Sequence, residues 1–361
     1  MKYRLKDICT KITDGSHNPP TGISKSQYLM LSSKNIADDC ITFDNPRYLT
    51  ESDFISENKR TSIQVGDLLL TIVGTVGRVA VVSNADNQIC LQRSVAVLKP
   101  KHDIANSRYL MYHLQHIRPI LEAEAKGVAQ KGIYLKQVEN IEVSIPAQST
   151  QNEIVEKLDI VSNLILLCKQ QSAELDELVR ARFVELFGDP IRNTQNRPTT
   201  DFINVVKMQR GFDLPVQDRQ QDGDIPVFGS NGALDRHNVA KVQGGGVITG
   251  RSGTIGKVYY TEGDYWPLNT SLFSVDTHGN NIIYLAYLLQ MYDLSRFTEG
   301  TGVPTLNRNK FHDKPIIDVP LREQELFASF VKQTDKSKQV VQNSIAELEE
   351  LKKSLMQKYF G

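Results

Sequence analysis

Several short segments of this sequence have residue types that catalytic and ligand-binding sites use, and each predicts a specific chemistry. Residues 250–257 read Gly-Arg-Ser-Gly-Thr-Ile-Gly-Lys and superficially resemble a phosphate-binding loop. That loop requires a glycine five residues before the glycine of its Gly-Lys pair, and serine or threonine after the lysine. Arg251 and Val258 occupy those two positions. The segment is therefore interpreted as a tight glycine-rich turn between strands.

Two further segments are also interpreted as structural. Residues 18–20 (Asn-Pro-Pro) are similar to an adenine-methyltransferase motif, which needs an aromatic residue next to stack the flipped base, but Thr21 follows. His113 and His116 are spaced to share a helix face, with no acidic residue or cysteine at metal-ligand spacing, so a half-buried helix surface is favoured. No nucleophile–base pair or pair of carboxylates recurs in both halves of the chain. The sequence therefore predicts no catalytic residue, cofactor or metal in this chain.

The chain contains two copies of one long pattern. Residues 74–79 (Gly-Thr-Val-Gly-Arg-Val) match 253–258 (Gly-Thr-Ile-Gly-Lys-Val), and 173–178 (Ala-Glu-Leu-Asp-Glu-Leu) match 346–351 (Ala-Glu-Leu-Glu-Glu-Leu). The matches keep their order while their separation falls from 197 to 173 residues, which is typical of a diverged tandem duplication. Each copy begins with short β-branched runs and turn residues, which predict strands such as 67–73 and 79–82.

A long helical pattern closes each copy after the strand-like runs 141–145 and 316–319. Apolar or small residues recur every three or four positions over 154–186, which is the coiled-coil period. The second stripe, over 327–359, is interrupted at Thr334 and Lys338. The residues predicted to form the coiled coil or bind a partner are Leu158, Ile165, Leu175, Phe183, Ile345, Leu348 and Leu355.

These patterns predict an α+β fold with two tandem α/β domains, separated and followed by long helices that form an antiparallel coiled coil with pseudo-two-fold symmetry. The expected segments are a first domain at 1–146, a central helix at 147–188, a second domain at 189–320 and a C-terminal helix at 321–361. Such a body suits DNA, whose backbone carries two-fold symmetry, with two half-sites read on one face. The helices are expected to set the distance between the half-sites.

Charge and composition limit the functions that are open. Lys+Arg and Asp+Glu each number 42 in 361 residues, so net charge gives no argument for nucleic acid, although a neutral chain can carry a basic face. The stretch 1–146 has a net charge of +3 and 189–320 of −1. No apolar run approaches the ~20 residues of a membrane span, residues 1–12 lack a signal-peptide core, and the four cysteines lie far apart. We therefore expect a cytoplasmic protein with reduced thiols and no membrane contact.

Polar loop residues that recur in both copies predict a binding function. The loop 33–35 lies opposite 230–232, the loop 92–94 opposite 269–271, and the loop 126–132 opposite 301–310. Small hydroxyls and amides are suited to positioning phosphates, and arginine and asparagine to reading base edges. The residues predicted to contact DNA are Ser16, His17, Ser33, Lys34, Arg78, Arg93, Lys131, Ser230, Asn231, Arg251, Asn269 and Arg308.

Several segments of the sequence resemble those of a known family. Residues 175–190 (Leu-Asp-Glu-Leu-Val-Arg-Ala-Arg-Phe-Val-Glu-Leu-Phe-Gly-Asp-Pro) are similar to the end of the central helix in specificity (S) subunits of type I restriction–modification systems. Residues 14–17 (Asp-Gly-Ser-His), 224–232 (Asp-Ile-Pro-Val-Phe-Gly-Ser-Asn-Gly) and 301–305 (Thr-Gly-Val-Pro-Thr) resemble segments of that family's target recognition domains. The resemblance extends over the whole chain in the family's order.

The resemblance implies a non-catalytic subunit that reads a bipartite sequence in double-stranded DNA, one half-site with each target recognition domain. Two methyltransferase (M) subunits, which bind S-adenosylmethionine, and ATP-driven restriction (R) subunits would assemble on it, with the helices as spacer and docking surface. S-adenosylmethionine, ATP and Mg are therefore expected in the partners. The low basic charge of the second domain leaves open whether affinity comes largely from the partner subunits.

Two other functions stay open on the sequence alone. The first is a freestanding enzyme, such as a nuclease or methyltransferase fused to a recognition domain, which would require a catalytic motif. The second is a coiled-coil scaffold or carbohydrate-type binding module, favoured if the protein with a methyltransferase partner shifted no DNA. The sequence predicts neither the target, nor the spacer length, nor which loop residues touch bases rather than phosphates.

Overall fold

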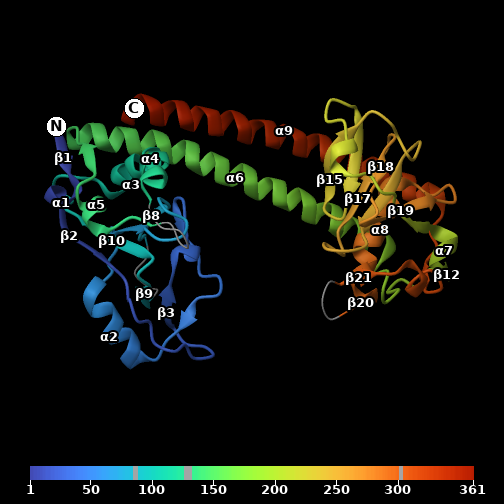
Figure 1. Ribbon diagram of the computed structural model, residues 1–361, viewed down its shortest axis with the longest axis horizontal. Coiled ribbons are helices and arrows are strands. Elements are labelled where there is room, and N and C mark those ends of the chain that lie inside the picture. The colour runs from blue at the N-terminus through green and yellow to red at the C-terminus, as the bar shows by residue number, and fades with distance from the viewer. Residues whose placement is uncertain (84–87, 126–131, 301–303) are drawn as a thin grey trace. The chain divides into compact units, whose positions relative to one another are not determined.

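The computed structural model describes residues 1–83, 88–125, 132–300 and 304–361 (Figure 1). The chain forms two compact units. Unit 1 comprises Met1–Leu167 together with Ile345–Gly361, and unit 2 comprises Cys168–Ser344. Because the division falls within the two long helices, unit 1 is built from two stretches that are far apart in the sequence. The four segment boundaries expected from the sequence stay a prediction.

Unit 1 consists of short strands joined by turns and helices. Its strands are β1 (Lys2–Arg4), β2 (Cys9–Asp14), β3 (Tyr28–Leu31), β4 (Ile36–Ala37), β5 (Cys40–Ile41), β6 (Arg47–Tyr48), β7 (Leu68–Thr71), β8 (Val79–Val81), β9 (Gln88–Leu91), β10 (Val95–Pro100) and β11 (Glu142–Ser144). Its helices are α1 (Leu5–Ile8), η1 (Ser33–Asn35), α2 (Glu51–Thr61), α3 (Ser107–His116), α4 (Arg118–Glu124), α5 (Leu135–Glu139), the first part of α6 (Gln148–Phe187) and the last part of α9 (Leu321–Phe360).

The centre of unit 1 is an antiparallel sheet with the order β2-β10-β7-β8. Side chains alternate across a strand, so Leu68 and Leu70 of β7 join a core cluster with Leu110 of α3. Leu69, between them, joins a second cluster on the opposite face with Leu31 of β3. Since both faces are covered, β7 is apolar at consecutive positions, which explains the continuous apolar run that predicts a strand here.

Unit 2 repeats this organisation. Its strands are β12 (Thr199–Asp201), β13 (Lys207–Arg210), β14 (Ile225–Gly229), β15 (Gly232–His237), β16 (Gly246–Gly250), β17 (Val258–Thr261), β18 (Trp266–Pro267), β19 (Ser271–Asp276), β20 (Thr298–Glu299), β21 (Thr305–Leu306) and β22 (Pro315–Ile317). Its helices are the end of α6, α7 (Phe202–Val205), η2 (Val216–Asp218), α8 (Ile282–Tyr292), η3 (Leu294–Phe297), η4 (Arg308–Lys310) and the first part of α9 (Leu321–Phe360).

The sheets of the two units have the same topology. The central sheet of unit 2 has the order β13-β19-β16-β17, and α8 covers it as α3 covers its counterpart (Figure 1). The pair β12–β22 corresponds to β1–β11. The sheet β15-β14-β18 corresponds to β6-β3-β9, and each contains one parallel pair. The duplication predicted from the sequence is therefore confirmed.

The glycine-rich segments are turns between strands, as predicted. Gly74 (φ +87°) and Gly77 (φ +88°) lie between β7 and β8, and Gly253 (φ +84°) and Gly256 (φ +91°) lie between β16 and β17. Positive φ angles favour glycine because a Cβ atom would be strained there. A phosphate-binding loop leads from a strand into a helix, whereas these segments lead from strand to strand.

Each long helix is anchored at its start by a buried glutamine. Gln151 accepts a hydrogen bond from the Asn106 backbone N–H (2.8 Å) and donates to the Ile104 and Pro146 carbonyls (both 2.9 Å). Gln324 accepts from the Asn281 backbone N–H (2.9 Å) in the same way. Both side chains are buried, so each amide replaces the water that would otherwise satisfy these backbone groups.

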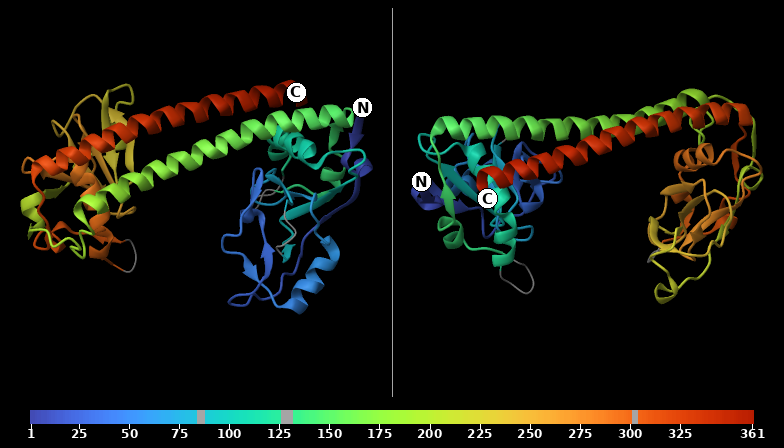
Figure 2. Two further views of the ribbon diagram at one scale, coloured as in Figure 1. Left: turned by 180° about the vertical axis from the view of Figure 1, so that it is seen from behind. Right: turned by 90° about the horizontal axis from the view of Figure 1, so that it is seen from above.

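Within each unit the long helices α6 and α9 run antiparallel (Figure 2). In unit 1, Leu158 near the start of α6 lies in one core cluster with Met356 near the end of α9. In unit 2, Phe183 near the end of α6 contacts Phe327 near the start of α9, with ring centroids 5.4 Å apart. Of the other predicted seam residues, Ile165 is buried and the following are half-buried: Leu175, Ile345, Leu348 and Leu355.

The apolar stripe of α9 is interrupted at Thr334 and Lys338, as the sequence indicates, but both side chains still make contacts at the seam. Thr334 is buried and donates to the Phe330 carbonyl (3.0 Å), and half-buried Lys338 pairs with Asp176 of α6 at 2.5 Å. Polar side chains therefore continue the seam, because a short hydroxyl turns back onto its own helix and a long lysine reaches a carboxylate.

One expectation from the sequence is corrected. His113 is buried rather than half-buried, and its ring makes an edge contact with Phe360 at a centroid distance of 5.5 Å. Neither ring nitrogen has a hydrogen-bond partner among the described residues. Burial lowers the pKa of His113 to about 4, so the ring is neutral at pH 7. The final turn of α9 thus covers a position that the helical spacing places at the surface.

Candidate nucleic-acid interface

The same backbone contacts form a pocket in each unit, at the end of the central sheet. In unit 1, Val73 forms a bridge with Gly132, and the Ile133 N–H donates to the Ile72 carbonyl (2.9 Å). In unit 2, the Leu306 N–H donates to the Arg251 carbonyl (2.8 Å). In both units, the residues that follow one central strand (β7 in unit 1, β16 in unit 2) therefore form backbone contacts with a later loop.

A glycine in each unit allows a second close approach at this place. A Cβ atom on Gly15 would lie 2.1 Å from the Leu91 carbonyl oxygen, and one on Gly211 would lie 2.2 Å from that of Leu268. No side chain fits at such a distance. The chain after β2 can therefore lie directly against the segment that precedes β10, and the chain after β13 against the segment that precedes β19.

These contacts also correct the pairing of one loop. The Gln92 N–H donates to the Leu31 carbonyl, and the Leu268 N–H donates to the equivalent Phe228 carbonyl. Gln92 therefore corresponds to Leu268, and Arg93 corresponds to Asn269. The sequence match of 92–94 with 269–271 is wrong by one residue, because a short polar stretch carries too little information to fix its register.

In unit 1 the pocket has a volume of about 430 Å³ and a basic rim on an apolar floor. Its floor includes Ile72 and Ile133, and its rim includes His17, Arg60 and Arg93. The lining also contains Asp14, whose side chain is only 8% exposed and which pairs with both His17 (2.8 Å) and Arg60. A buried carboxylate thus holds two donor side chains at the mouth.

In unit 2 the pocket has a volume of about 300 Å³ and is lined by Arg210, Arg251 and Arg308. None of these arginines forms an ion pair with a carboxylate in the described part of the chain. Glu299, which also lines the pocket, pairs with Lys310 instead (2.8 Å). Three guanidinium groups that share a pocket without counterions repel one another, so the pocket favours an anionic or electron-rich ligand.

The residues at these pockets that were not predicted from the sequence include Asp14, Arg60, Tyr134 and Arg210. Arg210 is the last residue of the central strand β13, as Asp14 is the last residue of β2, and Tyr134 leads into α5. Asp14 begins the segment 14–17, which resembles part of the family's target recognition domains, but the sequence predicted no role for it. Arg60 comes from α2, which has no counterpart in the described part of unit 2, so no repeated pattern could have indicated it.

The pockets bring together His17, Arg93, Arg251 and Arg308 of the residues predicted to contact DNA. Ser16 and Asn269 lie beside them, since the Ser16 carbonyl accepts from the Arg93 N–H (2.9 Å) and the Asn269 carbonyl accepts from Arg251 Nη1 (3.4 Å).

The other predicted residues lie at the glycine turns. Ser33 and Ser230 flank Gly74 and Gly253, and the Ser33 N–H donates to Ser94 Oγ (3.1 Å). Asn231 accepts from Lys257 Nζ (3.4 Å). The remaining residues of this group are exposed Lys34, on η1, and half-buried Arg78. Lys131 lies outside the described residues.

A larger pocket of about 790 Å³ in unit 1 is less suited to DNA. It lies between α4 and α5, and its lining includes Ile117, Ile120 and Leu121. Lys136 is accompanied there by Glu124 and Glu142. Two carboxylates against one lysine disfavour a polyanion.

The described residues give no indication of a metal centre, since no three His, Cys, Asp or Glu side chains are grouped to hold an ion. Among them, no helix is both long and apolar enough to cross a membrane. What both pockets offer is hydrogen-bond donors on a rigid scaffold. Arginine donors of this kind bind phosphate oxygens or the O6 and N7 atoms of guanine.

Comparison with known proteins agrees with this architecture. The specificity subunit of the type I restriction enzyme EcoBI of Escherichia coli is 31% identical over 105 residues, which are 28% of this chain and 22% of that protein. The match thus spans a minor part of the relative's length. The crystal structure of a type I restriction–modification system S subunit from M. genitalium superimposes with a TM-score of 0.59 at 13% identity, covering 100% of this chain and 96% of that one.

A second solved structure, which concerns complex assembly and conformational transition of the type I R-M system, superimposes with a TM-score of 0.57 at 15% identity, covering 100% and 97% of the two chains. At these identities the likeness concerns the fold. A profile of the type I restriction modification DNA specificity domain matches residues 1–177 and 192–350. Because these matches include most of the sequence, the chain belongs to the family of type I restriction–modification DNA specificity domain proteins.

Proposed function

We propose that this chain is the non-catalytic, sequence-specific DNA-binding subunit of a type I restriction–modification complex, and that each unit reads one half of a bipartite target in double-stranded DNA. The observation that carries this proposal is the pair of equivalent pockets. Their backbone contacts are the same, while their donors differ: Arg60, Arg93 and His17 in unit 1, and Arg210, Arg251 and Arg308 in unit 2.

A constant scaffold with different side chains is suited to reading two different sequences. Each base pair presents its own pattern of donors and acceptors in the major groove, so a change of side chain at one place changes the base that fits. A duplicated catalytic site would instead keep its reacting groups. At the equivalent last position of the first central strand, Asp14 in unit 1 and Arg210 in unit 2 have opposite charges.

The surface of α6 supports docking of a methyltransferase subunit. Ile160, Leu164 and Leu167 are 54%, 42% and 58% exposed and follow one another at helical spacing within unit 1. An exposed apolar stripe of this kind is suited to packing against another chain. Two M subunits, and R subunits where the host has them, would bring S-adenosylmethionine, ATP and Mg to the complex in the cytoplasm.

The proposal is tested by mapping adenine methylation in the host genome with and without this gene. We expect one bipartite methylation motif to disappear when the gene is deleted and to return when it is restored. A purified complex of this chain with its M subunits is expected to bind and methylate DNA that carries that motif. If deletion changes no motif, and the complex shifts no DNA of any sequence, the proposed function is wrong.

A further inference from the structure

Helix α2 carries Arg60 to the rim of the unit 1 pocket. The helix packs on β3, with the rings of Tyr28 and Phe54 5.0 Å apart. It ends at Ser62, which has the left-handed conformation (φ +43°) of a helix C-cap. In the described part of unit 2 the chain passes from β15 to β16 without a helix, so α2 is a feature of unit 1 alone.

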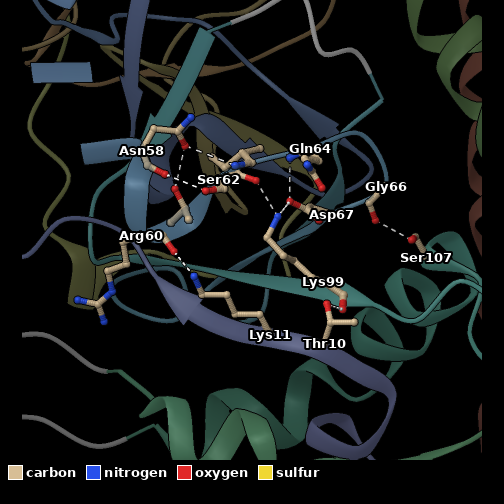
Figure 3. A network of polar contacts seen from close by, with 12 residues as sticks. Thr10, Lys11, Asn58, Arg60, Ser62, Gln64, Gly66, Asp67, Lys99 and Ser107 are labelled. Atoms are coloured by element: carbon tan, nitrogen blue, oxygen red, sulfur yellow. Dashed lines mark hydrogen bonds and ion pairs between the residues drawn. The ribbon is translucent and has the colours of Figure 1, made fainter. Parts of the chain in front are cut away.

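Two lysines hold the last turn of α2 (Figure 3). Lys11 Nζ donates to the carbonyl of Arg60 (2.6 Å), and Lys99 Nζ donates to the carbonyl of Ser62 (2.8 Å). The last carbonyls of a helix lack partners within the helix and attract cations. Lys99 is fixed in turn by an ion pair with the buried carboxylate of Asp67 (2.5 Å). The backbone at Arg60 is therefore held from two strands of the central sheet.

The side chain of Arg60 is held as firmly as its backbone. Its Nε donates to Thr13 Oγ1 (3.1 Å), and its Nη2 pairs with Asp14, which also holds His17. These bonds use one edge of the guanidinium. The other edge, formed by Nη1 and the second N–H of Nη2, has no partner among the described residues, and the side chain is 51% exposed.

We propose that this free edge of Arg60 donates two hydrogen bonds to O6 and N7 of one guanine in the half-site that unit 1 reads, with Asp14 as its positioning residue. The inference rests on the proposed function. Two parallel N–H groups match the two acceptors that guanine presents in the major groove. Because the arginine is already oriented by Thr13 and Asp14, binding freezes few additional torsions.

The alternative role for Arg60 is a contact with phosphate, and the two roles predict different results. A base contact sets the preference at one base pair. A phosphate contact weakens binding to all sequences equally and contributes about one unit to the slope of log affinity against log salt.

The test uses the full chain in complex with its M subunits and a library of DNA targets varied at each base pair of both half-sites. Arg60→Lys keeps the charge but removes the two parallel N–H groups of the guanidinium. The preference for one G·C pair is therefore expected to fall about 5- to 150-fold, while the slope of log affinity against log salt is unchanged. Arg60→Ala is expected to lower the same preference. Lys59→Ala removes a neighbouring charge on the same helix from an exposed position and is expected to leave every preference unchanged.

Asp14→Asn tests the positioning role. Alone, Asp14→Asn is expected to lower the same G·C preference. Combined with Arg60→Ala, it is expected to lower that preference no further than Arg60→Ala alone. A general destabilisation of unit 1 by Asp14→Asn would instead add to the effect of Arg60→Ala. Lys99→Met is expected to act at the same base pair.

The inference is overturned if Arg60→Lys keeps the full preference, if Arg60→Ala weakens all targets equally, or if the change falls in the half-site read by unit 2. Each of these results is obtained with a complex that recognises a bipartite target. A wild-type complex that recognises none would instead contradict the proposed function.

Discussion

At the residue scale, the two pockets separate the chain's basic residues into independent sets. We expect Arg93→Ala to relax base preference in one half-site by about 1–3 kcal/mol and to leave the other half unchanged. Arg251→Ala and Arg308→Ala are expected to act on the opposite half, because they line the other pocket. Competition binding with DNA libraries randomised in one half-site at a time measures both effects.

Arg192→Ala is the matched control, since this side chain is 82% exposed and lines neither pocket. It is expected to change no base preference. A substitution in one pocket that altered the bases preferred in both half-sites would show that the units do not read independently.

The buried His113 predicts a dependence of stability on pH. Burial lowers its pKa to about 4, below the ordinary value of about 6.5, so the unfolded chain takes up a proton first as the pH falls. The contribution to stability is complete above pH 6.5 and is lost as the pH falls toward 4, by about 2 kcal/mol at pH 5. Urea unfolding at pH 7 and pH 5 is expected to show a smaller loss for His113→Leu than for the wild type.

His102→Gln removes an exposed imidazole and is expected to keep the wild-type dependence. If His113→Leu and the wild type lost equal stability between pH 7 and pH 5, protonation of His113 would not be the cause.

At the scale of elements, α6 has one apolar stripe that is buried within the protein and another that is exposed. Leu158 of the buried stripe shares a core cluster with α9, whereas Leu164 of the other stripe is exposed. We expect Leu164→Glu to weaken binding of an M subunit at least tenfold. The reason is that an exposed leucine contributes about 1.5–3 kcal/mol when it becomes buried. Asn163→Glu adds the same charge at an exposed neighbour and is expected to change affinity little.

Isothermal titration of the chain with the M subunit measures the effect, and circular dichroism checks that the helices stay folded. Unchanged affinity for both Leu164→Glu and Leu167→Glu would place the docking surface elsewhere.

The elements were predictable from the sequence to different degrees. Periodicity predicted α6 and α9 to within a few residues, since a stripe of 40 residues averages over local exceptions. The doubled glycine turn was predictable because positive φ restricts the residue type. The burial of Thr334 in the helix seam was not predictable, because a hydroxyl is tolerated there only if it forms a hydrogen bond, as Thr334 does with the Phe330 carbonyl.

The pockets were predictable only in part. Arg93, Arg251 and Arg308 stood out as basic residues in repeated loops, but Arg60 and Asp14 meet only through the pairing of α2 with β2. Such a contact between segments 46 residues apart leaves no local pattern. The one-residue error at Asn269 has the same origin, since only the backbone hydrogen bonds define its register.

At the scale of the whole molecule, the sequence predicts that the helices set the spacing of the two half-sites. Four residues inserted after Ser172 of α6, with four after Lys338 of α9, add about 6 Å of helix and rotate each stripe by only about 40°. We expect methylation mapping to find the same half-sites with a spacer one or two base pairs longer, at ~3.4 Å per base pair. The same four residues inserted at Gly263, an exposed position with open space around it, are expected to leave the spacer unchanged. A functional helix variant with its original spacer would show that the helices do not set the distance.

The division of unit 1 into two stretches has a consequence for synthesis on the ribosome. Phe360, which lies against Tyr109 and His113, is made long after α3, and at about 5–20 residues per second the wait from residue 167 to residue 345 is roughly 10–40 s. Unit 2 is one continuous stretch and is complete before that segment emerges. We expect a nascent chain stalled just after unit 2 has left the exit tunnel to resist protease in unit 2 and to be cleaved in α3. The half of the protein that is translated first would then be the last to mature.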